Sequence, residues 1–124
     1  MPSAVVCDDD HMSRRVLRGL LTDAGFDVMG EADMALSALD LVAACRPDVL
    51  VLDVNLPGMS GLEIMRDLRE RSPDTSIIVV SAYDMTHLDT LDLRAAAVMP
   101  KTDLVHFDEV LTDVMASRGP TSAP

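Results

Sequence analysis

Short, wholly apolar runs alternate with segments of helical period, and this alternation constrains the fold more than any other feature of the chain. Residues 49–52 (Val-Leu-Val-Leu) and 77–80 (Ile-Ile-Val-Val) contain no polar side chain. A strand that is apolar on both faces is typical of the middle of a parallel sheet covered on both sides. Between these runs, Leu62, Met65 and Leu68 recur at the spacing of one helix face. The pattern therefore predicts an α/β fold.

The same strand-then-helix pattern recurs along the whole chain. We expect strands at 4–7, 27–32, 49–52, 77–80 and 97–99, and helices over about 12–24, 36–43, 62–71, 86–93 and 107–114, with Asp103 as a candidate N-cap for the last helix. Such alternation implies one doubly wound parallel sheet with helices on both faces, joined by right-handed crossovers. The length of 124 residues fits one domain. We place that domain at 1–117, and residues 118–124 have the composition of a flexible tail or linker.

The charge balance narrows the classes of partner. The chain carries a net charge of −11, which disfavours direct nucleic-acid binding and favours cations and basic protein surfaces. No apolar run approaches the roughly 20 residues needed to span a bilayer, and the N-terminus lacks a signal-peptide pattern, so we expect a cytoplasmic protein without a membrane partner. Cys7 and Cys45 lie in apolar contexts and are interpreted as reduced, buried thiols.

Polar residues gather where the predicted strands end. In an open parallel sheet, binding sites form at the carboxyl ends of the strands. Those ends carry Asp8, Asp9 and Asp10 after the first strand, Asp53 after the third, Ser81 after the fourth and Lys101 after the fifth. Taken singly, each has an ordinary explanation, such as a solvated loop, a helix cap or a surface charge. Together, at one edge of the sheet, they predict a site.

The residue types at that edge suggest a metal-assisted phosphoryl chemistry. Carboxylates of Asp8, Asp9 and Asp53 held close together would repel one another, and a hard divalent cation such as Mg²⁺ relieves that repulsion. Zinc is disfavoured, because no Cys/His cluster has ligand spacing. Asp53 can act as a nucleophile that forms an aspartyl phosphate, while Lys101 and the Ser81 hydroxyl contact the phosphoryl oxygens.

Two stretches of the sequence carry a family resemblance. Val-Val-Cys-Asp-Asp-Asp occupies residues 5–10, and Pro-Asp-Val-Leu-Val-Leu-Asp-Val-Asn-Leu-Pro-Gly-Met-Ser-Gly occupies residues 47–61. With Ser81 and Lys101, they make the chain resemble the CheY-like receiver domains of bacterial response regulators over about residues 4–117. The resemblance implies a (βα)5 fold with strand order 2-1-3-4-5.

The resemblance also implies a role for each site residue. Asp53 would be the phospho-acceptor, Asp9 a direct Mg²⁺ ligand, Asp8 a ligand acting largely through water, and the backbone carbonyl of Asn55 the last protein ligand. Ser81 would contact the phosphoryl group and reorient on activation, and Lys101 would bind phosphate. The implied donor is a phosphohistidine on a histidine kinase or a histidine phosphotransfer protein, and the implied output is a downstream effector domain or protein. For the chain itself, a homodimer is left open. His11, His87 and His106 are not needed for this chemistry and are interpreted as surface residues.

Three departures from the family pattern bear on the switch. Lys101 is followed by Thr102 instead of the usual proline, so we expect a trans peptide there. Val98 stands where the family has an aromatic switch residue. The segment from Ser81 to Lys101 is slightly short and lacks the usual glycine, which predicts an abbreviated fourth helix.

These departures leave alternatives open. The first is a phosphorylation-independent interaction module on the same fold. A second is a phosphatase of the haloacid-dehalogenase type. Such enzymes normally have a second acidic residue two positions after the nucleophile, where this chain has Asn55. Flavin binding is disfavoured by the 2% aromatic content. The kinase, the output, the oligomeric state and the phosphoryl lifetime are not determined by the sequence.

Overall fold

A computed structural model describes residues 1–54, 61–81 and 95–118. The predicted fourth helix, Asn55 and His87 lie outside these residues.

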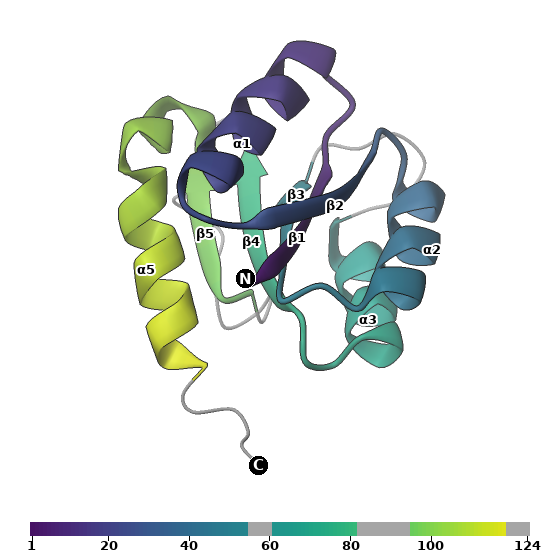
Figure 1. The fold of residues 1–124 in the computed structure, drawn as a ribbon. Coiled ribbons are helices and arrows are strands. Elements are labelled where there is room, and N and C mark those ends of the chain that lie inside the picture. Colours follow the sequence, from purple (N-terminus) through teal and green to yellow (C-terminus); the bar gives the residue numbers. More distant parts are fainter. Residues whose placement is uncertain (55–60, 82–94, 119–124) are drawn as a thin grey trace.

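The described strands form one parallel sheet in the order β2-β1-β3-β4-β5 (Figure 1). Their bounds are Ser3–Cys7 for β1, Asp27–Ala32 for β2, Val49–Asp53 for β3, Ser76–Ser81 for β4 and Ala97–Pro100 for β5. All five predicted strands are present, and the predicted order is confirmed. Every residue of β3 is buried, because this strand lies between β1 and β4 and has helices on both sides.

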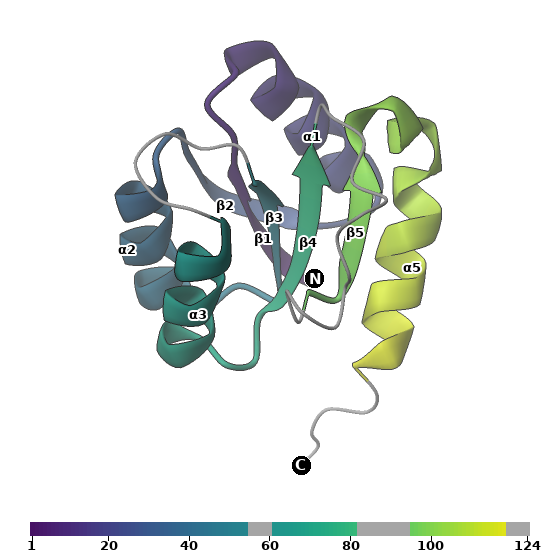
Figure 2. The same ribbon diagram turned by 180° about the vertical axis from the view of Figure 1, so that it is seen from behind.

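Helices cover both faces of the sheet, as predicted. The α-helices are α1 (His11–Asp23), α2 (Ala35–Cys45), α3 (Gly61–Arg71) and α5 (Phe107–Ser117), and a 3₁₀-helix, η1, spans Lys101–His106. Figures 1 and 2 show α1 and α5 on one face of the sheet and α2 and α3 on the other. Within the described residues, an apolar core lies on each face; Phe26 and Phe107 both belong to the core under α1 and α5, and the core under α2 and α3 has no aromatic ring. None of the described helices has the length and apolar content needed to cross a lipid bilayer.

The ends of α1 and α2 follow from local backbone chemistry. The Asp10 side chain caps α1 by accepting a hydrogen bond from the Ser13 N–H, and Gly25, at a φ of 90°, lies just after the last turn. At the end of α2, Arg46 adopts the left-handed conformation (φ 45°) directly before Pro47. Proline disfavours helical geometry in the residue before it, so the helix stops there.

Two sequence predictions were wrong. Asp103 is not the N-cap of the last helix, because residues 101–106 form η1 and α5 begins only at Phe107, without a side-chain cap. Burial explains the late start: the Phe107 side chain is fully buried, so the chain turns into the helix where that ring enters the core. Cys45 is only half-buried, whereas Cys7 is buried as predicted, and both thiols are free.

The segment around the predicted lysine has the expected backbone. The described residues contain no cis peptide bond, so the bond between Lys101 and Thr102 is trans. Pro100 ends β5, which lies at the edge of the sheet, where its missing N–H leaves no ladder hydrogen bond unmade.

Arg118 ties the end of α5 to the pole of the sheet where the strands begin. Its guanidinium donates hydrogen bonds to the carbonyls of Asp48 and Asp74, both at 2.8 Å, and to the Ser76 hydroxyl at 2.7 Å. The side chain is 17% exposed, so these bonds are largely shielded from water. Residues 119–124 are outside the described part, and the domain boundary after Ser117 stays a prediction.

We predict that Arg118→Ala lowers the free energy of unfolding by about 1–3 kcal/mol, because two backbone carbonyls lose a charged donor. Urea denaturation measures this loss. Arg66→Ala is the matched control, since Arg66 is exposed on α3 and its removal changes the net charge equally. Equal stability of the two variants would contradict the proposed contribution of the Arg118 contacts.

Candidate functional site

The carboxyl ends of four strands bring the predicted site residues to one rim of the sheet. Asp8 follows β1, Asp53 ends β3, Ser81 ends β4 and Lys101 follows β5. The strand register fixes their neighbourhood, since Asp53 pairs with Val80 in β4, and Ser81 pairs with the residue just before Lys101. This rim lies at the pole opposite the N-terminus (Figure 1).

Three carboxylates converge at that rim. One oxygen each from Asp8, Asp9 and Asp53 lies within 4.8 Å of the others. Asp8 is fully buried and Asp53 is 4% exposed, whereas Asp9 faces solvent. Two shielded acids and one solvent-facing acid make a pocket that is acidic and open on one side.

Asp10, the third member of the acidic run, has a different task. Its carboxylate accepts hydrogen bonds from the Ser13 N–H at 3.1 Å and the Ser13 hydroxyl at 2.7 Å. These bonds, with the side-chain bond contributing most, hold the pKa of Asp10 below its usual value. The run therefore divides into two acids that join the rim and one that caps α1.

Lys101 places its ammonium among the acids. Its Nζ lies 2.7 Å from Asp8 Oδ2 and 3.4 Å from Asp53 Oδ2. Burial, the largest influence, disfavours the charged form of Lys101, but the contacts with Asp8 and Asp53 together outweigh it, and the pKa is raised above its usual value. The lysine thus stays charged and offsets part of the negative charge.

The polar atoms of Asp8 have partners on three different elements or turns. Its N–H donates to the Ala32 carbonyl at 3.0 Å, and its Oδ1 accepts from the Asp10 N–H at 2.8 Å. Asp8 Oδ2, which is buried, is paired with the Lys101 ammonium at 2.7 Å. One ammonium does not balance three carboxylates, and a hard divalent cation would offset the remaining negative charge. Asp8, Asp9 and Asp53 therefore fit a divalent metal ion.

Of the other predicted residues, some are described by the structure and some are not. Ser81 is 1% exposed and sits between the strand that carries Asp53 and the strand that leads to Lys101. Asn55, predicted to offer its carbonyl, is outside the described residues. His11 and His106 are exposed, as predicted. Val98, at the expected switch position, is half-buried and packs against the core beneath α2 and α3.

Comparison with known proteins shows the family of the chain. The sequence model of the response regulator receiver domain matches residues 4–115. The chain belongs to the response regulator receiver domain family. Receiver domains of this family accept a phosphoryl group in two-component signalling, and they interact with kinases and effector domains.

Individual relatives place the receiver domain among longer regulators. It is 39% identical over 104 residues to the DNA-binding transcriptional activator DevR/DosR of Mycobacterium tuberculosis, covering 82% of this chain and 48% of the relative. It is 34% identical over 101 residues to a protein-glutamate methylesterase/protein-glutamine glutaminase of Hahella chejuensis, covering 78% of this chain and 29% of the relative. The chain thus spans less than half the length of these curated relatives.

A solved structure supports the same assignment. The signal receiver domain of the response regulator NarL from Mycobacterium tuberculosis superposes with a TM-score of 0.78 at 31% identity. The match covers 95% of this chain and 97% of that structure. The two chains therefore share the receiver fold over nearly their whole lengths.

Sequence reasoning missed two residues that touch the rim of this receiver domain. The Ser13 hydroxyl accepts a hydrogen bond from Lys101 Nζ at 3.2 Å, and Arg14 Nη1 donates to the Asp8 carbonyl at 2.9 Å. A serine three positions after Asp10 is a local capping signal and could have been noticed. The Arg14 contact depends on how α1 packs beside β1, which no local pattern reports.

Cys7 lies directly beneath the acidic rim. Burial, followed by the charges of Asp8, Asp53 and Asp33, raises the pKa of the Cys7 thiol to about 12. Its sulfur faces the Met34 carbonyl at 3.8 Å. The thiol therefore stays protonated at neutral pH and packs as an apolar group.

We predict that native protein at pH 8 reacts rapidly with a thiol reagent at Cys45 alone, and at both thiols once unfolded in guanidinium. Cys7 is fully buried and protonated, whereas Cys45 is half-buried. Absorbance of the released thiolate counts the reactive groups, and a Cys45→Ser variant identifies which thiol reacts. Fast native labelling of that variant would contradict the burial of Cys7.

Proposed function

We propose that this receiver domain accepts a phosphoryl group on Asp53 from a phosphohistidine of a partner protein and uses Mg²⁺ held at the acidic rim. The observation that carries the proposal is the convergence of Asp8, Asp9 and Asp53 within 4.8 Å, with Lys101 beside them. Phosphoryl transfer needs mainly positioning and charge stabilisation, and this arrangement supplies both.

In the proposed step, a carboxylate oxygen of Asp53 attacks phosphorus. An O–P bond forms while the N–P bond of the donor breaks, and the donor imidazole leaves with the electron pair. Asp53 is suited to this role because it ends a fully buried strand, which fixes its backbone, while its side chain retains 5% exposure toward solvent.

The metal would be held by Asp8, Asp9 and Asp53, with the carbonyl of Asn55 as a further predicted ligand. When bound, Mg²⁺ neutralises charge on the carboxylates and on the phosphoryl oxygens. Asp8 and Asp53 supply shielded carboxylates, and the exposed Asp9 would give an ion access from solvent. These features support a hard cation at this site.

Lys101 and Ser81 would bind the transferred group. The ammonium of Lys101 now lies between Asp8 and Asp53, so a small side-chain movement brings it to a phosphoryl oxygen on Asp53. Ser81 ends the neighbouring strand and offers a hydroxyl to the same group. In the family, the aromatic switch residue couples the reorientation of the hydroxyl residue to the protein surface. Because Val98 stands at that position, a movement of Ser81 would be coupled to the surface through other residues.

The output follows from the phosphorylated state through protein contacts. A histidine kinase or a phosphotransfer protein would be the donor, and an effector domain or protein the recipient; the relatives include a DNA-binding activator and a methylesterase. The domain itself would modify only its own Asp53 and turn over no external substrate. A cytoplasmic location and a homodimer remain predictions. The family and relatives give no support to the alternative of a phosphorylation-independent module.

We predict that acetyl phosphate with Mg²⁺ adds one phosphoryl group to the wild type, and that Asp53→Asn abolishes this addition while preserving the fold. The amide is nearly isosteric with the carboxylate but is not a competent nucleophile. Intact-protein mass spectrometry measures the addition, and circular dichroism checks the fold.

Asp23→Asn is the matched control for this variant, because Asp23 is an exposed acid at the end of α1. It should be labelled like the wild type. Stoichiometric labelling of Asp53→Asn would show that another residue is the acceptor, and an unlabelled wild type would favour the phosphorylation-independent module.

We predict that Mg²⁺ stabilises the domain by about 1.4 kcal/mol at a free concentration about ten times its Kd. The rise in melting temperature measures this effect, with NaCl at equal ionic strength as the salt control. Asp9→Asn should lose the rise, since it removes one carboxylate of the cluster.

Asp10→Asn is the neighbouring control for the metal experiment. Its carboxylate caps α1 and does not belong to the three-carboxylate cluster, so the variant should keep the Mg²⁺-dependent rise whatever its own stability. Equal responses of the Asp9 and Asp10 variants would argue against the proposed metal site.

A further inference from the structure

Arg14, in the first turns of α1, is connected to the acidic rim through the backbone of Asp8. Its Nη1 donates a 2.9 Å hydrogen bond to the Asp8 carbonyl. That carbonyl belongs to the peptide group that links Asp8 to Asp9, the two acids of β1's end that join the cluster. A bond to this oxygen therefore fixes the plane from which both side chains depart.

The guanidinium is itself held in place. Arg14 Nε lies 3.6 Å from Glu31 in β2, and a second nitrogen lies 3.3 Å from the His11 ring. Glu31 is in turn bound by Arg18 at 2.8 Å. The planar fork of an arginine can serve two such partners at once, which a lysine ammonium does less well. Arg14 thus joins the end of β1 to α1 and β2.

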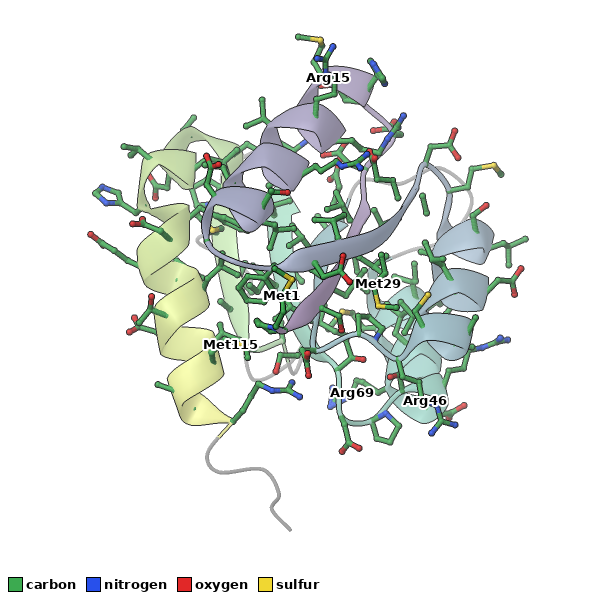
Figure 3. The ribbon with its side chains drawn as sticks, in the orientation of Figure 1. Met1, Arg15, Met29, Arg46, Arg69 and Met115 are labelled. Carbon is green, nitrogen blue, oxygen red and sulfur yellow. The ribbon has the colours of Figure 1, made fainter. Side chains whose placement is uncertain are left out.

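Burial separates this contact from an ordinary surface ion pair. The Arg14 side chain is 18% exposed, although it lies near the start of an exposed helix. Arg15, next in sequence, is exposed, and Figure 3 shows it at the outer end of α1, away from the sheet. Exposed pairs contribute little to stability, whereas a shielded donor on a buried carbonyl restricts the local backbone.

The peptide group that precedes Asp8 is held by β2. The Asp8 N–H donates to the Ala32 carbonyl of β2 at 3.0 Å. With the carbonyl bound to Arg14, neither peptide group flanking Asp8 is free to rotate. The carboxylates of Asp8 and Asp9 are consequently presented together before any ion arrives.

We propose that Arg14 is a positioning residue for metal binding, which orients Asp8 and Asp9 through the peptide group between them. The inference rests on the proposed metal site. The inference predicts an effect on Mg²⁺ affinity opposite to that of charge alone. Removal of the positive charge of Arg14 would by itself tighten Mg²⁺ binding, whereas loss of its hydrogen bond to the Asp8 carbonyl should weaken it.

Isothermal titration with Mg²⁺ alone tests the inference on the whole chain. Arg14→Ala should raise the Kd about tenfold, as is typical for loss of a group that orients metal ligands. Arg15→Ala, which removes the same charge one residue away, should leave the Kd unchanged or lower it. Arg14→Lys keeps the charge and should give an intermediate Kd.

Two further measurements separate positioning from a loss of folding. A thermal melt without Mg²⁺ checks that each variant is folded at the titration temperature. If Arg14→Ala is unfolded there, the Kd of Arg14→Lys is compared with that of the wild type instead. At saturating Mg²⁺, the rate of Asp53 phosphorylation by acetyl phosphate should return close to the wild-type rate, because Asp53 and Lys101 are unchanged.

The outcomes distinguish the inference from the function on which it rests. If the wild type binds Mg²⁺ and both Arg14 variants bind it as tightly as Arg15→Ala does, Arg14 does not position the ligands. If the wild type binds no Mg²⁺, the metal site itself is wrong, and the inference falls with it.

Discussion

The mutual repulsion of three carboxylates within 4.8 Å is the constraint on which the rest of the domain depends. Two of these acids are shielded from water, where an unpaired charge is strongly unfavourable. Lys101 relieves part of that repulsion, and its contact with Asp8 at 2.7 Å keeps the lysine charged. The remaining negative charge attracts a cation. The same charge imbalance makes the rim costly to build and suits it to a metal ion.

Such an arrangement needs a rigid platform, which the apolar strands provide. β3 is buried along its whole length and ends in Asp53, while helices on both faces close the two cores (Figures 1 and 2). Close packing of this kind resists displacement of the strand ends. The polar contacts of Asp8 add a local restraint, because Ala32 and Arg14 hold its two peptide groups. Stability and site geometry therefore come from the same elements.

Particular residues show which features of the fold and the site could be predicted from sequence patterns. The apolar runs predicted the strands, and the strand ends predicted that Asp8, Asp9, Asp53, Ser81 and Lys101 would meet. The prediction of Asp103 as a helix cap was wrong, because α5 begins at Phe107, whose side chain is buried in the tertiary structure. Ser13 and Arg14 were not predicted at all. Their contacts with Lys101 and Asp8 join residues on different elements, and no local spacing reports such a meeting.

The sequence by itself determined the element order, the parallel sheet and the set of polar residues at its rim. These follow from hydrophobic period and chain connectivity, which are local and topological properties. Only the tertiary structure decided how the acidic run is divided, with Asp10 capping α1 while Asp8 and Asp9 turn to the cluster. It also decided that Lys101 bridges Asp8 and Asp53 and that Arg14 binds the carbonyl of the peptide between Asp8 and Asp9. Side-chain direction and burial settle these roles, and both arise only when the helices pack on the sheet.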